Sequence, residues 1–327
     1  MTKYIFRRIG LMIPVIFGVL VIVFIINRMA GDPVVMLIGS DATEEEYASE
    51  RERLGLDKPV PVQFYEYVKG VVTRFDLGTS FVSRRPVSEQ ILVRFPTTLR
   101  LALISLCISS VLGIAFGVVC AINQNTKADY IVSLLAMIVA SLPNFWFALM
   151  MILFFAVNLG ILPATGLDEW KGWVLPAVVL GLGPISNLCR TTRSSMLEVI
   201  RQDYIRTAKS KGISDNKVIF KHTLKNALFP VITVFGLMAS LNIGGQVVVE
   251  TIFTIPGIGS YMMTSITNKD YPVVQGTVIV LSLMVCVINL LVDIAYGFAD
   301  PRIRLGYASN KKSKRAKKPA RIVEVAQ

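Results

Sequence analysis

Long apolar runs without a single Asp, Glu, Lys or Arg alternate with polar stretches along this chain. A helix that crosses a bilayer needs about 17–25 mostly apolar residues, because backbone groups in lipid must be bonded within their own segment. Six runs meet this requirement: Ile9–Ile26, Leu101–Ile122, Ile131–Val157, Gly172–Cys189, Ala227–Val249 and Val273–Val292. The pattern predicts an all-α integral membrane protein with six transmembrane helices, over about 9–28, 99–122, 131–157, 172–189, 227–249 and 273–298.

The first run follows Lys3, Arg7 and Arg8, as the apolar core of a secretory signal peptide would. Its length exceeds the about 7–15 apolar residues of such a core. Arg28-Met29-Ala30 is also a poor cleavage site, because signal peptidase needs small residues there. We therefore expect an uncleaved first span.

The composition excludes a soluble enzyme. Of the 327 residues, 53% are hydrophobic and 17% are charged, whereas soluble domains carry about 25% charged residues. Mean hydropathy is +0.59. The net charge of +12 lies between the apolar runs rather than on one amphipathic face, which indicates basic loops at a membrane and not nucleic-acid binding.

Basic residues concentrate on one side of the predicted membrane. The loop Arg190–Asn226 has nine basic and three acidic residues, whereas Asn27–Thr98 has nine basic and eleven acidic residues. The positive side of a membrane protein is cytoplasmic. We therefore expect a multi-pass protein of a bacterial-type cytoplasmic membrane, with residues 1–8, the 190–226 loop and a basic, disordered tail over 300–327 on the cytoplasmic side. Both termini are then cytoplasmic.

The external segment, residues 29–96, is long enough to hold structure of its own. Thr43 before three glutamates resembles a helix start, and Leu54-Gly55-Leu56-Asp57-Lys58-Pro59 would stop that helix. A second helix is expected over Gln63–Arg74, closed by Phe75-Asp76-Leu77-Gly78.

Motifs of known chemistry are missing from the sequence. It contains no G-x-x-x-x-G-K-[ST] phosphate loop, no G-x-S-x-G elbow and no H-E-x-x-H pair. One histidine, His222, and four cysteines without C-x-x-C spacing predict no metal site and no disulfide framework. Glu250 and Asp293 are the candidate relays of an ion-coupled carrier. We expect both to be helix-end residues within reach of the headgroups, and secondary transport stays the alternative.

The loop Asp203–Gly212 predicts a short cytoplasmic helix that ends at Gly212, a favourable residue just past a helix. Ile205 and Ala208 share one face with Tyr204 beside them, which suits a groove on a partner protein. A helix that lies on the bilayer surface would fit the same residues.

Within this loop, Arg206-Thr207-Ala208, three residues and Gly212 resemble the E-A-A-x-x-x-G loop of ABC importer permeases. The following Phe220-Lys221-His222-Thr223-Leu224-Lys225-Asn226-Ala227 resembles its continuation. The general motif has Glu-Ala in place of Arg206-Thr207, and Ile and Pro in place of His222 and Lys225. Both departures look like the form used by the dipeptide/oligopeptide/nickel branch.

Further motifs extend this resemblance to about Leu305 and are similar to the B-type permease subunit of the branch. In chain order these motifs are Tyr4-Ile5-x-Arg7-Arg8, Gly31-Asp32-Pro33, Leu54-Gly55-Leu56-Asp57, Asp76-Leu77-Gly78-Thr79-Ser80, Arg190-Thr191-Thr192-Arg193-Ser194-Ser195-Met196, Glu250-Thr251-Ile252-Phe253, Pro256-Gly257-Ile258-Gly259 and Asp270-Tyr271-Pro272.

The resemblance implies a type I importer permease without catalytic or metal-binding residues. Its partners would be a second related permease subunit, two ATP-binding subunits that hold ATP and Mg, and an external substrate-binding protein. The ATPase-coupling residues would be Asp203, Tyr204, Ile205, Arg206, Thr207, Ala208, Gly212, His222, Leu224 and Asn226. The external gate, or binding-protein docking site, would comprise Asp76, Gly78, Glu250, Phe253, Pro256, Gly257, Gly259 and Asp270. The larger external loop could instead pack on the partner permease.

Substrates of this branch include peptides, nickel and related solutes, and we expect a peptide substrate with nickel or another small solute as the alternative. Small and amide side chains in the spans are expected to line a conduit that hydrates many peptides without gripping one. These candidates are Ser141, Asn144, Asn187, Asn242 and Gln246.

Overall fold

A computed structural model describes residues 2–29, 33–39 and 42–299 as a helical molecule. Within these described residues, the only extended pairing is an isolated β-bridge between Thr79 and Pro86. Five helices are long and apolar enough to cross a membrane, and one bent helix pair raises the number to six. The all-α, six-span prediction is therefore confirmed. The expected disordered tail, 300–327, lies outside the described residues.

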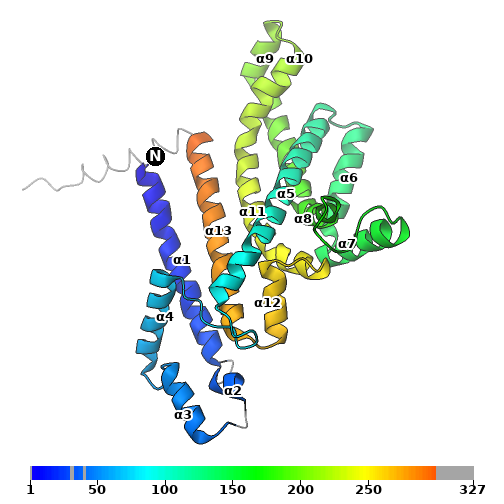
Figure 1. The fold of residues 1–327 in the computed structure, drawn as a ribbon. Helices are drawn as coiled ribbons and strands as arrows, with labels where there is room; N and C mark the ends of the chain where they lie inside the picture. Colours follow the sequence, from blue (N-terminus) through cyan, green and yellow to red (C-terminus); the bar gives the residue numbers. More distant parts are fainter. Residues whose placement is uncertain (1, 30–32, 40–41, 300–327) are drawn as a thin grey trace, which may run out of the picture.

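The spans form the middle of the molecule, between α9 and α10 at one end and α2 and α3 at the other (Figure 1). The continuous ones are α1 (Thr2–Met29), α5 (Val87–Ile122), α8 (Lys171–Ile200), α11 (Lys225–Ile252) and α13 (Tyr271–Ala299). The bent pair consists of α6 (Lys127–Ser141) and α7 (Asn144–Met151), and the π-helical η1 (Ile152–Asn158) continues α7.

The continuous helix expected over 131–157 is wrong. Its two halves meet at 106°, and Leu142 between them is extended, with φ −82° and ψ 131°. Pro143 explains the break, because a proline removes a helical hydrogen bond and disfavours the α conformation of the residue before it. Pro176 and Pro184, by contrast, lie inside the unbroken α8.

Two helices, α5 and α8, extend furthest beyond the apolar runs that predict them. α8 continues past Cys189 to Ile200, and α5 begins at Val87 rather than near residue 99. Apolar composition marks the part of a helix that faces lipid, whereas the hydrogen-bonded helix extends into water on either side. The polar extensions connect the membrane core to the sites at its two ends.

The most extensive helix packing joins α5 to α8, where two glycines four residues apart face the neighbouring helix. A Cβ on Gly113 would lie 2.7 Å from Cβ of Leu188, and a Cβ on Gly117 would lie 2.5 Å from Cβ of Thr192. Small residues at this spacing let two membrane helices approach closely. The two helices form the centre of the membrane core.

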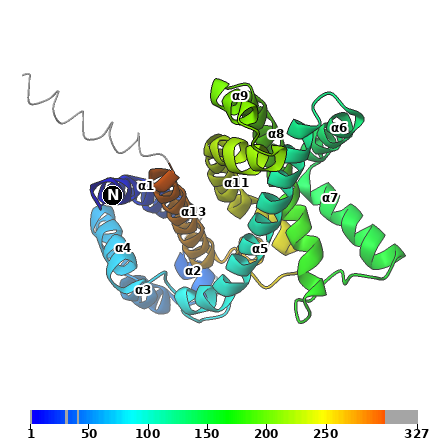
Figure 2. The ribbon, with the colours of Figure 1, turned by 90° about the horizontal axis from the view of Figure 1, so that it is seen from above.

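α1 and α13 lie together at one side of the molecule, and α6 and α7 lie at the other (Figure 2). Asn27 of α1 donates a 2.7 Å hydrogen bond to Gln275 of α13. Arg8 and Asp293 form an ion pair of 2.8 Å between the same helices. Asp293, expected only to reach the headgroups, therefore has a protein partner.

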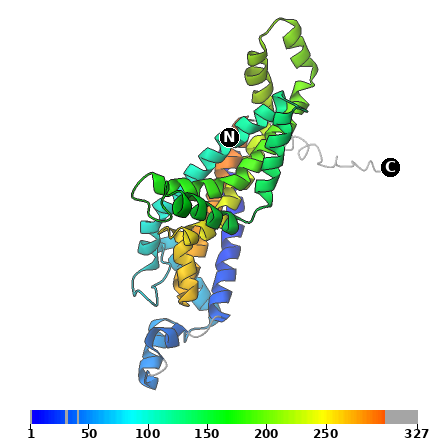
Figure 3. The same ribbon diagram turned by 90° about the vertical axis from the view of Figure 1, so that its right-hand side faces the viewer.

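The external segment folds as α2 (Pro33–Ile38), α3 (Glu44–Arg53) and α4 (Val60–Arg74), which confirms its two predicted helices. Thr43 and Glu46 form a capping box at the start of α3. α4 packs on α1, where the ring of Phe24 lies 5.2 Å from that of Phe64. Figure 3 shows α2 and α3, in blue, at the opposite end of the molecule from the loop between α8 and α11.

Candidate functional site

Residues 203–224 form a helical hairpin that projects beyond the ends of the spans (Figures 1 and 3). It comprises α9 (Asp203–Ser210), α10 (Asp215–Lys217) and the π-helical η2 (Val218–Leu224). The predicted end of the first helix is confirmed, since Gly212 follows α9 with φ +76°. This left-handed conformation favours glycine.

The apolar face of α9 is already covered by the hairpin itself. Ile205 is 1% exposed and Ala208 is 9% exposed, and both pack with Val218 of η2. The expectation that these two side chains fill a groove on a partner is therefore wrong, because an amphipathic helix buries its apolar face on the nearest apolar surface. Here that surface belongs to η2, the returning helix of the same hairpin, and the pattern of α9 alone does not reveal it.

The outward surface of the hairpin is polar, and Asp203, Arg206 and Thr207 are exposed on it. Tyr204 is 46% exposed, and its hydroxyl accepts a 2.9 Å hydrogen bond from the Asn226 amide. The same amide donates to the carbonyl oxygen of His222. Leu224 packs on a small cluster of α5, α8 and α11 at the root of the hairpin. The predicted coupling residues thus divide into an exposed surface and an internal framework.

At the other end of the spans, Glu250 is fully buried. Its carboxylate accepts hydrogen bonds from the hydroxyl of Thr98 at 2.7 Å and from the backbone N–H groups of Gly259 at 2.7 Å and Ser260 at 3.1 Å. Thr98 in turn accepts a hydrogen bond from the Ile258 N–H. The carboxyl group thus lies at the N-terminus of α12 (Ile258–Thr267), where the helix dipole favours a negative charge.

The expected place of Glu250 in reach of the headgroups is therefore wrong. Gly257 and Gly259 explain how the carboxyl group approaches so closely: a Cβ on Gly257 would lie 2.2 Å from Oε2 of Glu250, and one on Gly259 would lie 2.9 Å from it. Residues 253–257, between α11 and α12, form a non-helical turn. Phe253 is buried in this turn, and Pro256 is exposed.

Asp270 forms a second external joint, next to the start of α13. It is 3% exposed and accepts hydrogen bonds from the Ser80 hydroxyl at 2.5 Å and the Phe81 N–H at 3.0 Å. Asp76, which is exposed, accepts from the N–H of Gly78 at 3.0 Å. The external residues predicted from the sequence therefore form two joints, one around Glu250 and one around Asp270.

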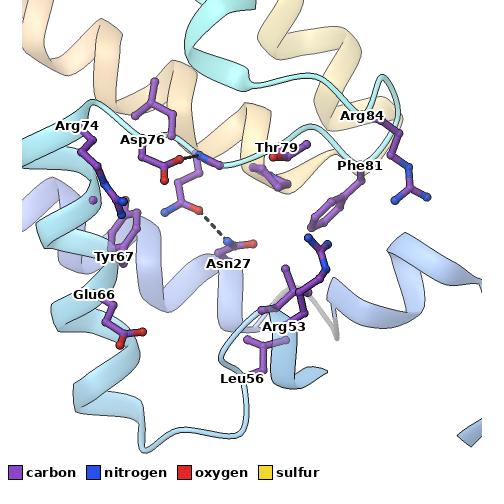
Figure 4. Close-up of a pocket in the computed structure, with 16 residues that line it drawn as sticks. Asn27, Arg53, Leu56, Glu66, Tyr67, Arg74, Asp76, Thr79, Phe81 and Arg84 are labelled. Carbon is purple, nitrogen blue, oxygen red and sulfur yellow. Dashed lines mark hydrogen bonds between the residues drawn. The ribbon is translucent and has the colours of Figure 1, made fainter. Parts of the chain in front are cut away.

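A pocket of about 550 Å³ lies between α1, α4, the 76–84 loop and α13. Figure 4 shows Tyr67 and Arg74 on one wall and Phe81 and Arg84 on the other, with Asn27 between them. The pocket borders the Asp270 joint through the 76–84 loop and Pro272. It gives the external end a recessed, mixed polar and aromatic surface.

The five candidate path residues are not brought together. Ser141 and Asn144 are exposed on either side of the bend, and Asn187 is half-buried. Asn242 is buried, donates to the Leu180 carbonyl at 3.2 Å and accepts from the Ser105 hydroxyl at 3.3 Å. Gln246 is buried and donates to the carbonyl of Thr98.

The interpretation of Asn242 and Gln246 as conduit-lining residues is therefore wrong in this structure. Both amides hold α11 against α5 and α8 of the same chain. An amide in a membrane helix fits a wet conduit and a helix–helix hydrogen bond equally well, so residue type alone does not separate these roles.

Sequence reasoning missed an ion pair at the hairpin end of the spans. Arg193 of α8 donates from Nε and Nη2 to the two carboxylate oxygens of Asp129 of α6, both at 2.7 Å. The side chain of Asp129 is 3% exposed and that of Arg193 is 30% exposed. Two features of the sequence could have indicated this ion pair: a lone acidic residue in the short loop before the third apolar run, and an arginine within the Arg190–Met196 motif.

Comparisons with known proteins agree with this architecture. Residues 113–305 match the family described as "Binding-protein-dependent transport system inner membrane component", and residues 1–102 match its N-terminal family. The chain is 39% identical to the di/tripeptide transport system permease protein DppB of Pseudomonas aeruginosa, over 93% of this chain and 99% of that protein. It is 40% identical to the glutathione transport system permease protein GsiC of Salmonella choleraesuis, with the same coverage.

The fold is similar to that of a chain of the MetNI methionine ABC transporter, solved in inward-facing conformations. The TM-score is 0.57 at 19% identity, over 65% of this chain and 97% of that chain. The chain therefore belongs to the binding-protein-dependent transport system inner membrane component family, the permeases of ABC importers.

Proposed function

We propose that this chain is the pore-forming permease subunit of an ATP-driven importer of di- and oligopeptides. The observation that carries the proposal is its identity of about 40%, over nearly its full length, to permeases named for di/tripeptide and glutathione transport. Glutathione is itself a tripeptide. Two relatives of similar identity thus share a peptide substrate class.

ATP is hydrolysed by two separate ATP-binding subunits in this proposal, because the sequence has no phosphate loop. The exposed surface of the hairpin around Arg206 and Tyr204 is the docking surface for these subunits. Its support is the polar, exposed character of that surface and the resemblance of Arg206–Gly212 to the coupling loop of the family. The nine basic residues of the 190–226 loop favour its cytoplasmic location.

A second, related permease subunit completes the pore, and an external binding protein delivers the substrate. The 76–84 loop and the turn before α12 provide the surface for that protein, with Asp76 and Pro256 exposed on it. The Glu250 and Asp270 joints hold this surface in shape. Ser141 and Asn144, exposed at the bend, remain the candidates for the wall of the conduit.

Ion-coupled secondary transport is the less favoured alternative. A proton or ion relay needs carboxylates that can change their partners. Glu250 has three hydrogen-bond donors, and Asp293 pairs with Arg8. Both carboxylates thus have structural partners in the described part of the chain.

Uptake assays with the full complex and its cognate binding protein test the substrate. Labelled di- and tripeptides are compared with chelated nickel, each with the other as competitor. We expect saturable peptide uptake that unlabelled peptides compete away and nickel does not. Saturable nickel uptake without peptide competition would replace the peptide assignment by the nickel alternative.

A further inference from the structure

The Asp129–Arg193 ion pair is built as a rigid joint rather than a surface contact. The guanidinium and the carboxylate meet through two parallel hydrogen bonds of 2.7 Å. This paired geometry fixes the relative orientation of both side chains as well as their distance. The carboxylate also accepts from the N–H of Asn125 at 3.0 Å and from the hydroxyl of Ser133 at 3.4 Å. These partners come from α8, from α6 and from the loop that precedes α6.

The joint lies on the path from the hairpin to the bend. α8 runs unbroken from Arg193 to Ile200, roughly 10 Å along its axis, and α9 begins at Asp203. α6 runs from Asp129 to Ser141, roughly 18 Å away at the bend. A displacement of the hairpin therefore reaches Arg193 through one rigid helix, and Asp129 connects it to a second one.

A cavity of about 670 Å³ lies between α6 and α8, next to the ion pair. Both residues of the ion pair line it, together with Ser133, Ser141 and Ser186. Ser186 also donates a hydrogen bond to the carbonyl of Ala136. The cavity is thus bounded by the ion pair towards the hairpin and reaches Ser141, a candidate wall of the conduit.

We propose that Asp129 and Arg193 are positioning residues that make α6 move together with α8 when the hairpin is displaced. A movement of the hairpin would then change the width of the cavity between α6 and α8. The inference rests on the proposed function, since it assumes that separate ATPase subunits move the hairpin. Neither residue needs to touch the transported peptide.

The test measures ATP hydrolysed per peptide imported by the reconstituted full complex with its binding protein. Asp129→Asn and Arg193→Gln should each raise this ratio by about tenfold, the range of a typical coupling free energy. The double variant should keep the raised ratio, because it also lacks the two parallel hydrogen bonds, although it leaves no lone buried charge. Arg190→Gln is the matched control, since Arg190 is exposed on the same helix and donates a 2.9 Å hydrogen bond to Asn187 of that helix. Its ratio should be unchanged.

A purely structural role gives a different result. The variants would then lower the amount of assembled complex while the assembled fraction keeps the unaltered ratio, and that result would overturn the proposal. If the neutral variants do not assemble, Arg193→Lys decides, because it keeps the charge and loses the two parallel hydrogen bonds. An unaltered ratio in this variant would also overturn the proposal. If the complex imports another solute instead of peptides, the proposed function fails, and the same ratio for that solute still tests the joint.

Discussion

The carboxylate of Glu250 and the hydroxyl of Thr98 meet at 2.7 Å in the interior, although 152 positions separate them in the sequence. Through this contact α5 and α11 hold the N-terminus of α12, whose Gly259 and Ser260 N–H groups point at the same carboxylate. The external turn is therefore fixed by one buried acid and not by contact with headgroups.

Glu250→Gln should destabilise this joint. The amide nitrogen of Gln cannot accept a hydrogen bond, so at least one buried donor loses its partner at a cost of about 1–3 kcal/mol. Thermal unfolding of the purified complex measures the loss. Glu66→Gln is the matched control, because Glu66 is half-exposed and pairs with Lys58 at 2.8 Å, a contact worth less than about 1 kcal/mol. Equal stability of the two variants would contradict the buried joint.

Gly117→Ala should separate α5 from α8. The added methyl group would lie 2.5 Å from Cβ of Thr192, and overpacking of this kind costs about 1–3 kcal/mol. Gly18→Ala in α1 adds the same methyl group where no atom lies within 4 Å, and its effect should stay within about 0.5 kcal/mol. The two variants are compared by thermal unfolding and by the amount of each protein in the membrane. A neutral Gly117→Ala would show that the two helices are not closely packed.

Ile205→Ala and Arg206→Glu separate the framework of the hairpin from its docking surface. Ile205 is buried in the hairpin, so its truncation should cost about 2–5 kcal/mol of local stability and speed amide hydrogen exchange in residues 203–218. Arg206 is exposed, so its reversal should leave exchange unchanged and lower ATP-driven uptake by at least about tenfold. Normal uptake by Arg206→Glu would remove this surface from the docking assignment.

Single cysteines at the exposed Asp76 and Pro256 should crosslink to the external binding protein. A Cys107→Ser background removes the one native cysteine that is exposed. Glu169→Cys, exposed in another external loop, is the control and should react less. Mass spectrometry of the crosslinked products identifies the partner. Consistent crosslinking to the second permease subunit instead would favour the alternative in which this loop packs within the complex.

The sequence predicted the helices and helix ends that depend on residues close together in the chain. Charge-free runs predicted the spans, Thr43 before three glutamates predicted α3, and Gly212 predicted the end of α9. Proline was less informative, since Pro143 breaks its span while Pro184 does not break α8. The difference depends on the neighbouring helices, which can compensate for the lost hydrogen bond in one place and not in another.

The candidate sites depend on long-range contacts and were predicted less well. The apolar face of Ile205 and Ala208 was found, but its partner, Val218, lies in the same hairpin. Asn242 was recognised as an unusual polar residue in a span, yet its partners Ser105 and Leu180 come from two other helices. The Asp129–Arg193 contact spans 64 positions, and no local pattern connects the two residues.

The energy source of uptake tests the account most directly. Vesicles with the full complex and the binding protein are supplied with labelled tripeptide, with or without ATP on the hairpin side and with or without an ion gradient. The account predicts saturable uptake that requires ATP and survives collapse of the gradient, and no ATP hydrolysis by this chain alone. Uptake driven by an ion gradient in the absence of ATP, or ATP hydrolysis by the isolated chain, would contradict it.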